Sequence, residues 1–160
     1  MKQVKTNVQK ILEQKKINHT ILTYPHSNEA VDGEKVAEYL NEDPNCVFKT
    51  LVTKSTTKPN TYYVFVVPVL NNLDLKKAAK VVDEKAIEMV HVKDLLSITG
   101  YIRGGCSPIG MKKQFPTIFD ETIILNDYII FSAGMIGYQV KITPNSAVNL
   151  TNAIIADIIK

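Results

Sequence analysis

Apolar residues at helical spacing predict five helices in this chain. The first covers residues 3–16, with Val4, Val8, Ile11 and Leu12 on its inner face. Three more are predicted after capping residues, which are Asp32, then Asn72 or Asp74, then Thr143. The fifth covers residues 92–99, where Gly100 ends it. In the helix after Thr143, Pro144 takes the first position, and Leu150, Ile154 and Ile158 share one stripe.

Runs rich in β-branched and aromatic residues predict seven strands. They cover residues 19–24, 46–54, 62–69, 86–90, 117–119, 128–131 and 138–142. The second and third form a predicted hairpin across turn residues 55–60. Residues 62–69 are almost continuously apolar up to Pro68, so this strand is expected to be central and buried on both faces. Residues 132–137 are predicted as the turn between the last two strands.

The order of these elements predicts the fold class. Helices lie among the strands without regular βαβ repetition, which favours an α+β fold. We expect a mixed, mostly antiparallel and barrel-like sheet of six or seven strands with flanking helices. The chain has 160 residues and shows no linker or repeat, so residues 1–160 are expected to form a single domain.

Composition narrows the possible settings of the protein. The net charge of +3 and the pI near 8.7 allow a phosphate or nucleic-acid partner without requiring one. The two cysteines, Cys46 and Cys106, have no zinc-type spacing to each other or to histidines, so no metal is indicated. No apolar run is long enough to span a membrane, and no secretory leader is recognisable. We therefore expect a soluble cytoplasmic protein.

The segment from Thr99 to Lys113 is the strongest candidate for chemistry. It contains Gly104, Gly105 and Gly110, and Pro108 restricts the backbone between them. Such a loop can direct several backbone N–H groups at an anion or a carbonyl oxygen. Arg103, Lys112 and Lys113 flank it with positive charge. A plain glycine-rich turn with a solvated basic flank has the same composition.

Three side chains have both a functional and an ordinary interpretation. Lys49 lies on an apolar strand face with Val47 and Leu51, where a lysine either reaches solvent or meets an anion or a polarised carbonyl. His26 lies in a predicted loop. It acts either as an acid, a base or a hydrogen-bond donor, or is a surface residue without a role. Cys106 is either a thiol nucleophile, for which no base is recognisable, or a small packed residue.

Several segments together resemble one known family. They are residues 47–51 (VFKTL), 73–80 (LDLKKAAK) and 99–113 (TGYIRGGCSPIGMKK), followed in order by 115–117 (FPT) and 132–134 (SAG). This pattern resembles the YbaK/EbsC family of aminoacyl-tRNA deacylases, which is related to the editing domain of bacterial prolyl-tRNA synthetase. The resemblance runs from the first predicted helix to the last.

The resemblance implies a function and partners. It implies a freestanding deacylase that removes a wrong amino acid, above all cysteine, from tRNA(Pro), with Cys-tRNA(Cys) as a further substrate. The partners implied are the acceptor end of the tRNA and prolyl-tRNA synthetase, with no membrane and no cofactor. In this branch of the family the substrate's own thiol attacks its ester carbonyl and forms a thiolactone, so the protein needs no nucleophile. Alanine as the amino acid removed, or binding of a tRNA end or a nucleotide without catalysis, are the alternatives.

The predicted site combines the resemblance with the reading of the residues. The catalytic residues are Lys49, Gly104 and Gly105, and the substrate-binding residues are Tyr24, His26, Thr50, Arg103, Ser107, Pro108, Ser132 and Gln139. Lys49 matches the family's functional lysine, Tyr24 its pocket tyrosine and Ser132 its pocket serine. Gln139 stands where relatives have an aspartate, so any contact it makes with the substrate amine lacks charge. On this interpretation Cys106 packs and does not react.

Overall fold

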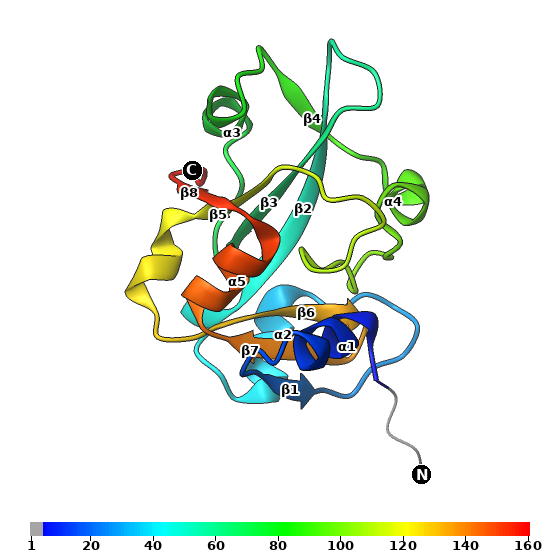
Figure 1. Ribbon diagram of the computed structural model, residues 1–160, viewed down its shortest axis with the longest axis vertical. Helices are drawn as coiled ribbons and strands as arrows, with labels where there is room; N and C mark the ends of the chain where they lie inside the picture. Colours follow the sequence, from blue (N-terminus) through cyan, green and yellow to red (C-terminus); the bar gives the residue numbers. More distant parts are fainter. Residues whose placement is uncertain (1–4) are drawn as a thin grey trace.

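Strand β3 (Tyr62–Pro68) lies at the centre of the larger of two sheets in the computed structural model, which describes residues 5–160 (Figure 1). Its side chains alternate between two cores, as strand geometry requires. Val64 and Val66 face the core shared with the smaller sheet, whereas Phe65 and Val67 face the core under helix α3 (Leu75–Val81). All four are fully buried, which confirms the prediction of a central strand buried on both faces.

Eight strands are present in the described residues, one more than predicted. The larger sheet has the order β4-β2-β3-β5-β8, with β2 (Phe48–Ser55), β4 (Ile87–Met89), β5 (Thr117–Asp120) and β8 (Ile154–Ala156). The smaller sheet has the order β1-β7-β6, with β1 (Thr20–Thr23), β6 (Ile129–Met135) and β7 (Tyr138–Ile142). Only β5 pairs in parallel, with β3 and with β8, so the sheets are mixed and mostly antiparallel as predicted.

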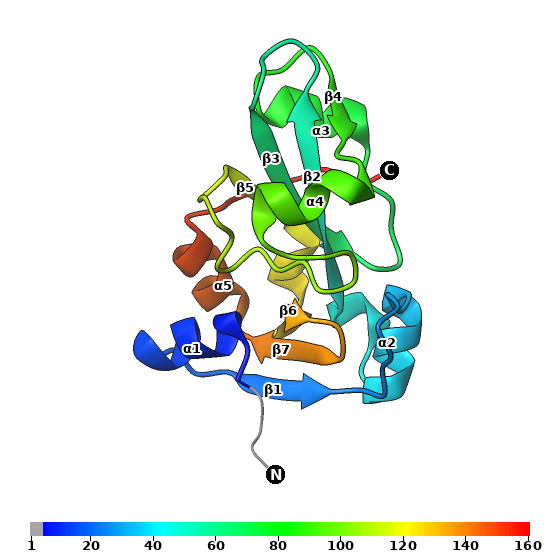
Figure 2. The same cartoon turned by 90° about the vertical axis from the view of Figure 1, so that its right-hand side faces the viewer.

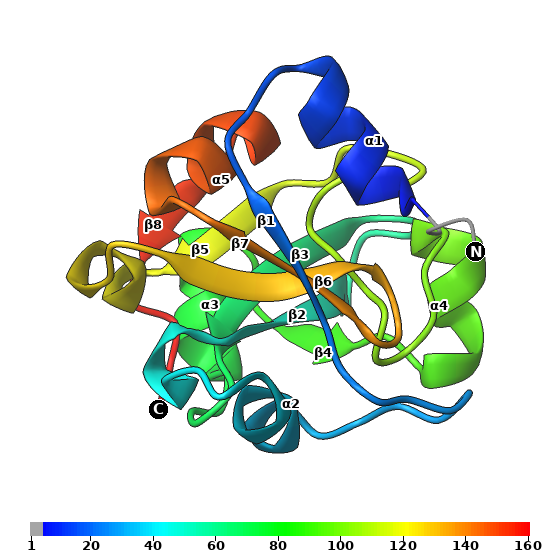
Figure 3. The ribbon, with the colours of Figure 1, turned by 90° about the horizontal axis from the view of Figure 1, so that it is seen from below.

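The two sheets meet at the start of β2. An isolated parallel bridge joins Val47 to Ile130 of β6, and Phe48 and Val52 pack with Phe131 of the smaller sheet. Seen from below, the smaller sheet crosses the end of the β2–β3 hairpin (Figure 3). This crossing fixes the start of β2 against β6. The strands form two sheets, whereas one barrel-like sheet was predicted.

Helices cover the outside of the sheets. They are α1 (Asn7–Gln14), α2 (Gly33–Leu40), α3, α4 (Val92–Thr99) and α5 (Pro144–Thr151), with the short 3-10 helices η1 (Pro44–Cys46) and η2 (Glu121–Leu125). Thr6 caps α1 by accepting a bond from the N–H of Gln9, so α1 begins later than predicted; the predicted residues 3 and 4 lie outside the described range. None of the helices within residues 5–160 has the length and apolar character that a membrane crossing needs.

Other boundaries also differ from the prediction. Asp74, and not Asn72, caps α3 with its carboxylate, and the inner face of that helix consists of Ala78 and Ala79 because Leu75 is largely exposed and Val82 lies beyond the helix. Cys46 ends η1, so β2 begins at Phe48.

Residues 132–134 form no turn. They continue β6 to Met135 through an irregularity in its register with β7, and Tyr128 lies outside the strand. A β-bulge of this kind lets a strand absorb extra residues without ending. The turn between β6 and β7 is therefore limited to Ile136 and Gly137.

The C-terminal segment contradicts the predicted helical tail. Helix α5 ends at Thr151, and Asn152 takes the left-handed conformation at φ 52°. Residues 154–156 then pair with β5 as strand β8, and Ile154 is 53% exposed, so Leu150, Ile154 and Ile158 form no helical stripe. Asn is one of the few residues that tolerates this conformation at a helix end.

Asp120 anchors the tail that follows β8. Its carboxylate is fully buried and accepts bonds from the N–H of Ile158 at 3.1 Å and from the hydroxyl of Thr122 at 2.7 Å. Ile158 in turn fills the core under α3. A single side chain therefore joins the end of β5 to the last residues of the chain.

Asp120→Ala is expected to lower the free energy of unfolding by about 2–4 kcal/mol, because it leaves the buried N–H of Ile158 without its acceptor. The matched control is Asp157→Ala, which removes only an exposed ion pair with Lys77 at 3.0 Å and should cost less than about 1 kcal/mol. Urea denaturation of both variants measures the difference. Equal losses would show that Asp120 does not anchor the tail.

Candidate active site

A cavity of about 110 Å³ opens where the start of β2 meets α2, the glycine-rich loop and the smaller sheet. It is lined by Tyr24, Val31, Gly33, Val36, Val47, Phe48, Lys49, Thr50, Val69, Gly104, Cys106, Ser132 and Gln139. Of the eleven residues predicted for the site, six line this cavity: Tyr24, Lys49, Thr50, Gly104, Ser132 and Gln139. These six residues come from segments far apart in the sequence, and the fold brings them into one cavity lining.

Strand β2 contributes two neighbouring polar residues to the cavity wall. Lys49 and Thr50 pair with Val67 and Val66 of β3, so the central hairpin fixes their backbone. Lys49 is half-buried, and none of the residues 5–160 forms an ion pair with it. It is also the one charged residue among those that line the cavity.

The hydroxyl of Thr50 stands out among the buried polar side chains. In the described part of the chain, its Oγ1 is the one fully buried side-chain N or O atom without a hydrogen-bond partner. An unpaired buried hydroxyl typically costs about 1–3 kcal/mol of stability. A ligand in the cavity could supply the missing partner.

Tyr24 forms the wall on the side of α2. It is almost completely buried, and its ring stacks on Tyr39 of α2 with centroids 6.3 Å apart and an interplanar angle of 6°. Its backbone N–H donates to the carbonyl of Gly137 at 3.0 Å, which ties the end of β1 to the β6–β7 turn. Tyr24 is therefore fixed at both its ring and its backbone.

Ser132 and Gln139 face each other across the β6–β7 register. The Ser132 hydroxyl accepts a bond from the N–H of Gly134 at 3.1 Å, and its own hydrogen remains free to donate. Gln139 is 6% exposed, and its amide has no partner among residues 5–160. The smaller sheet thus presents one hydroxyl and one uncharged amide to the cavity.

The glycine-rich loop runs between α4 and β5 and passes beside β6 and β7 (Figure 2). The N–H of Gly105 donates to the carbonyl of Ile102 at 3.0 Å and closes a four-residue turn with Gly104 in its third position, at φ +85°. A type II turn requires a positive φ at its third residue, which is why glycine is favoured at this position. The prediction of a free Gly105 N–H is wrong, because the turn uses that donor.

Other donors of the same loop remain available. The structure gives no acceptor, within residues 5–160, to the backbone N–H groups of Gly104, Cys106 and Ser107. Since buried N–H groups are nearly always paired, donors left free in a buried loop are an unusual feature. Sequence reasoning included Gly104 and Ser107 in the site but left out Cys106, whose free N–H has no signal in the composition.

Five of the predicted residues lie outside the cavity wall. The Ser107 hydroxyl is fully buried and accepts a bond from the N–H of Ile109 at 3.3 Å, so it shapes the loop. Pro108 is buried beside it, Gly105 is engaged in the turn, and Arg103 is exposed on that turn. His26 lines a neighbouring groove. The predicted direct contacts of these side chains with a ligand in the cavity are therefore not supported.

Cys106 lines the cavity but is poorly suited to attack. It packs in the core shared by the two sheets, and burial raises the pKa of its thiol to about 12. At neutral pH the thiol is therefore protonated, whereas the reactive form is the thiolate. The interpretation of Cys106 as a packed residue agrees with this environment. Within residues 5–160 no cluster of three or more metal-ligating side chains occurs either.

Comparison with known proteins agrees with this architecture. A family model described as the aminoacyl-tRNA editing domain matches residues 27–150. An Enterococcus faecalis protein named "Putative Cys-tRNA(Pro)/Cys-tRNA(Cys) deacylase EbsC" is 45% identical over 157 residues, which cover 98% of this chain and 94% of that protein.

Two solved structures share the fold. The "Crystal structure of a putative trans-editing enzyme for prolyl tRNA synthetase" has a TM-score of 0.83 and 24% identity, and the match covers 96% of this chain and 94% of that one. The "Crystal structure of hypothetical protein APE2540" has a TM-score of 0.85 and 16% identity, and the match covers 96% and 99%. At these identities the structures support the fold alone.

Thr50→Val is expected to raise the free energy of unfolding by about 1 kcal/mol, because it removes a buried hydroxyl that has no partner and keeps the side-chain shape. The matched control on the same strand is Thr53→Val, whose hydroxyl donates to the carbonyl of Tyr63 at 3.2 Å. That variant should lose about 1 kcal/mol. Thermal or urea unfolding of both proteins tests the contrast; a loss of stability in Thr50→Val would show that its hydroxyl is satisfied.

Proposed function

This chain belongs to the aminoacyl-tRNA editing domain family, and we propose that it is a deacylase that removes a mischarged amino acid from tRNA. The bond cleaved is the ester between the amino acid and the terminal ribose. The amino acid proposed is cysteine, carried by tRNA(Pro) or tRNA(Cys), the substrates in the name of the Enterococcus relative. The whole chain is proposed to act as one editing domain.

The observation that carries this proposal is the convergence of unsatisfied polar groups on one small cavity. Its lining includes Thr50, whose hydroxyl is buried without a partner, the half-buried Lys49, and Gln139, whose amide has no partner within residues 5–160. Groups of this kind cost stability when left alone, so their collection in one place favours a polar ligand. An aminoacyl ester, with a carbonyl, an amine and a ribose, supplies partners for each.

The backbone of the glycine-rich loop supplies the donors that ester cleavage needs. Attack on an ester carbonyl places negative charge on its oxygen, and preorganised N–H groups stabilise that charge. We assign this role to the N–H groups of Gly104 and Cys106, two residues of the cavity lining whose N–H groups have no acceptor within residues 5–160. Lys49 is assigned to the same developing charge or to the terminal phosphate or ribose.

The proposed cleavage uses the substrate's own thiol. The sulfur attacks the carbonyl carbon, a C–S bond forms, and the C–O bond to the ribose breaks. The thiol proton passes to the leaving ribose oxygen, which gives a cyclic thiolactone and tRNA with a free terminal hydroxyl. The protein then contributes no nucleophile, which agrees with the high pKa of Cys106.

Gln139 gives the cavity an uncharged partner for the substrate amine. The amide oxygen can accept one hydrogen bond from an amine, but no carboxylate lines the cavity in the described residues. Because Lys49 brings positive charge to the same wall, an uncharged amine fits this cavity better than an ammonium group.

The acceptor end of the tRNA and prolyl-tRNA synthetase are the proposed partners, and the cytoplasm is the proposed location.

The direct test incubates the purified chain with Cys-, Ala- and Pro-tRNA(Pro) and follows loss of the ester bond. Cys-tRNA(Pro) should lose its amino acid fastest, because only cysteine carries the attacking thiol. Lys49→Ala should slow this loss by about 100-fold or more, since it removes charge stabilisation at the reacting group. Cys106→Ser should keep the activity of the parent.

The matched control for Lys49→Ala is Lys54→Ala on the same strand, where Lys54 pairs with the exposed Glu88 at 3.5 Å. That variant should deacylate like the parent protein. Binding of the three aminoacyl-tRNAs without any loss of ester would select a non-catalytic module instead. Faster loss of the ester from Ala-tRNA(Pro) would identify alanine, and not cysteine, as the amino acid removed. It would also exclude a cleavage that depends on a thiol of the substrate.

A further inference from the structure

A second hollow lies beside the candidate active site and has no role in the cleavage described above. It is a groove of about 370 Å³ lined by His26, Ser27, Asn28, Gly100, Tyr101, Ile102, Gly134, Met135 and Ile136. Ile102 and Met135 are 48% and 40% exposed, so their apolar side chains are open to solvent. The groove is large enough for a small organic group.

Three segments line both hollows, each with residues two positions apart. Tyr24 lines the cavity and His26 the groove; Gly104 lines the cavity and Ile102 the groove. On β6 the same relation holds between Ser132 and Gly134. The hollows are therefore neighbours along all three segments.

The wall between the hollows is thin and tightly packed. A Cβ atom added at Gly104 would lie 2.8 Å from Cβ of Ala30 and 3.3 Å from Cγ1 of Ile136. One added at Gly105 would lie 3.1 Å from the backbone nitrogen of Ile136. The turn at these glycines thus fills the space between the loop at residues 25–31 and the β6–β7 turn.

The groove has groups that a nucleobase can use. His26 is held with Nδ1 3.1 Å from the carbonyl of Tyr24; a carbonyl only accepts, so Nδ1 donates and Nε2 remains available to a ligand. Ser27 and Asn28 add hydrogen-bonding groups, and Ile102 and Met135 add an apolar surface. Unpaired bases in protein–RNA complexes stack on aromatic rings and are hydrogen-bonded at their edges, and His26 and Tyr101 are the ring-bearing residues of this groove.

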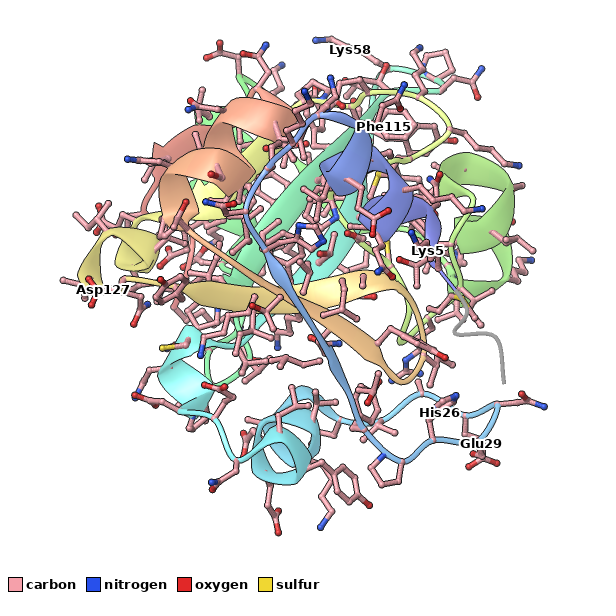
Figure 4. The ribbon with its side chains drawn as sticks, turned by 60° about the horizontal axis from the view of Figure 1, so that its bottom comes forward. Lys5, His26, Glu29, Lys58, Phe115 and Asp127 are labelled. Atoms are coloured by element: carbon pink, nitrogen blue, oxygen red, sulfur yellow. The ribbon has the colours of Figure 1, made fainter. Side chains whose placement is uncertain are left out.

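The charges at the rim favour a phosphate-linked partner. The aliphatic chain of Lys112 lies against Gly100, with its Cγ 3.2 Å from where a Cβ of Gly100 would be. Arg103 is exposed next to Ile102. Glu29, on the same loop as His26, is an acid near this rim (Figure 4). Two cations against one carboxylate leave the rim positive.

We propose that this groove binds the base of the terminal nucleotide of the tRNA, while the cavity holds the amino acid esterified to its ribose. This inference rests on the proposed function. The ribose spans the wall at Gly104, and Lys112 and Arg103 lie near the terminal phosphate. The base thereby sets the distance of the ester carbonyl from the loop donors.

The test uses Ile102→Asp, which replaces apolar surface by a charge of the same sign as the phosphate. With Cys-tRNA(Pro), KM should rise about tenfold or more while kcat stays within about twofold, because base contacts bind the substrate without touching the ester. The matched control is Ile124→Asp, at a site that is 70% exposed on η2 and away from both hollows. It should leave both constants unchanged.

An independent readout is the binding of adenosine 5′-monophosphate, followed by NMR of the labelled parent chain. The largest shifts should map to residues 26–28, 100–102 and 134–136, and Ile102→Asp should weaken binding about tenfold. If Ile102→Asp does not fold, as judged by its thermal transition, Met135→Ala replaces it in both measurements.

The outcomes separate the two proposals. A parent that deacylates Cys-tRNA(Pro), with nucleotide shifts outside the groove or an unchanged KM in the folded variant, overturns the groove assignment and leaves the deacylase standing. A parent that leaves every ester intact overturns the deacylase, whatever the shifts show. Concentration-dependent dimerisation that Ile102→Asp abolishes would assign the groove to a second copy of the chain and overturn base binding.

Discussion

Both hollows depend on the absence of side chains at Gly104 and Gly105. The turn that these residues form is pressed between Ala30 and the backbone of Met135 and Ile136, at distances where a Cβ atom would clash. Gly104 also takes a backbone conformation that other residues adopt at a cost of about 1 kcal/mol or more. The close approach holds the loop against the smaller sheet. Gly104 and Cys106 thereby share one cavity lining with Phe48 and Lys49 at the start of β2.

The core keeps this arrangement rigid while polar groups in the cavity stay unpaired. Strand β3 is buried on both faces, and β2 is paired with it along seven positions from Phe48 to Lys54. The bridge between Val47 and Ile130 then attaches the start of β2 to the smaller sheet. With its backbone fixed in this way, Thr50 can keep a buried hydroxyl without a partner. The apolar contacts of the sheets compensate for the stability that such groups lose.

The sequence predicted most of the fold because its signals are local. The double burial of β3, the caps at Asp74 and Thr143, and the stop at Gly100 each follow from a few neighbouring residues. Strand β8 was missed because its isoleucines also fit a helical stripe, and only the parallel pairing with β5 decides between the two. That pairing lies between distant segments, so no local pattern contains it.

The site was predicted in part for the same reason. Lys49, Thr50, Gly104, Ser132 and Gln139 were found as residue types in a recognisable order, and the cavity brings them together with Tyr24. Which donors remain free depends on internal hydrogen bonds. The turn uses the N–H of Gly105, and the loop uses the hydroxyl of Ser107. A composition that suits an oxyanion site cannot show which of its donors the loop has already used.

Cys106 illustrates how environment, and not residue type, decides chemistry at this site. A thiol beside free backbone donors has the composition of a nucleophile. Burial raises its pKa to about 12, however, and leaves it protonated at neutral pH. A thiol that enters the open cavity with a substrate is not held in that buried position, and Lys49 lies on the cavity wall. A nearby ammonium group favours a thiolate, so the same functional group would be more reactive on the substrate than on the protein. The loop is thus better suited to stabilising charge on a carbonyl than to attacking it.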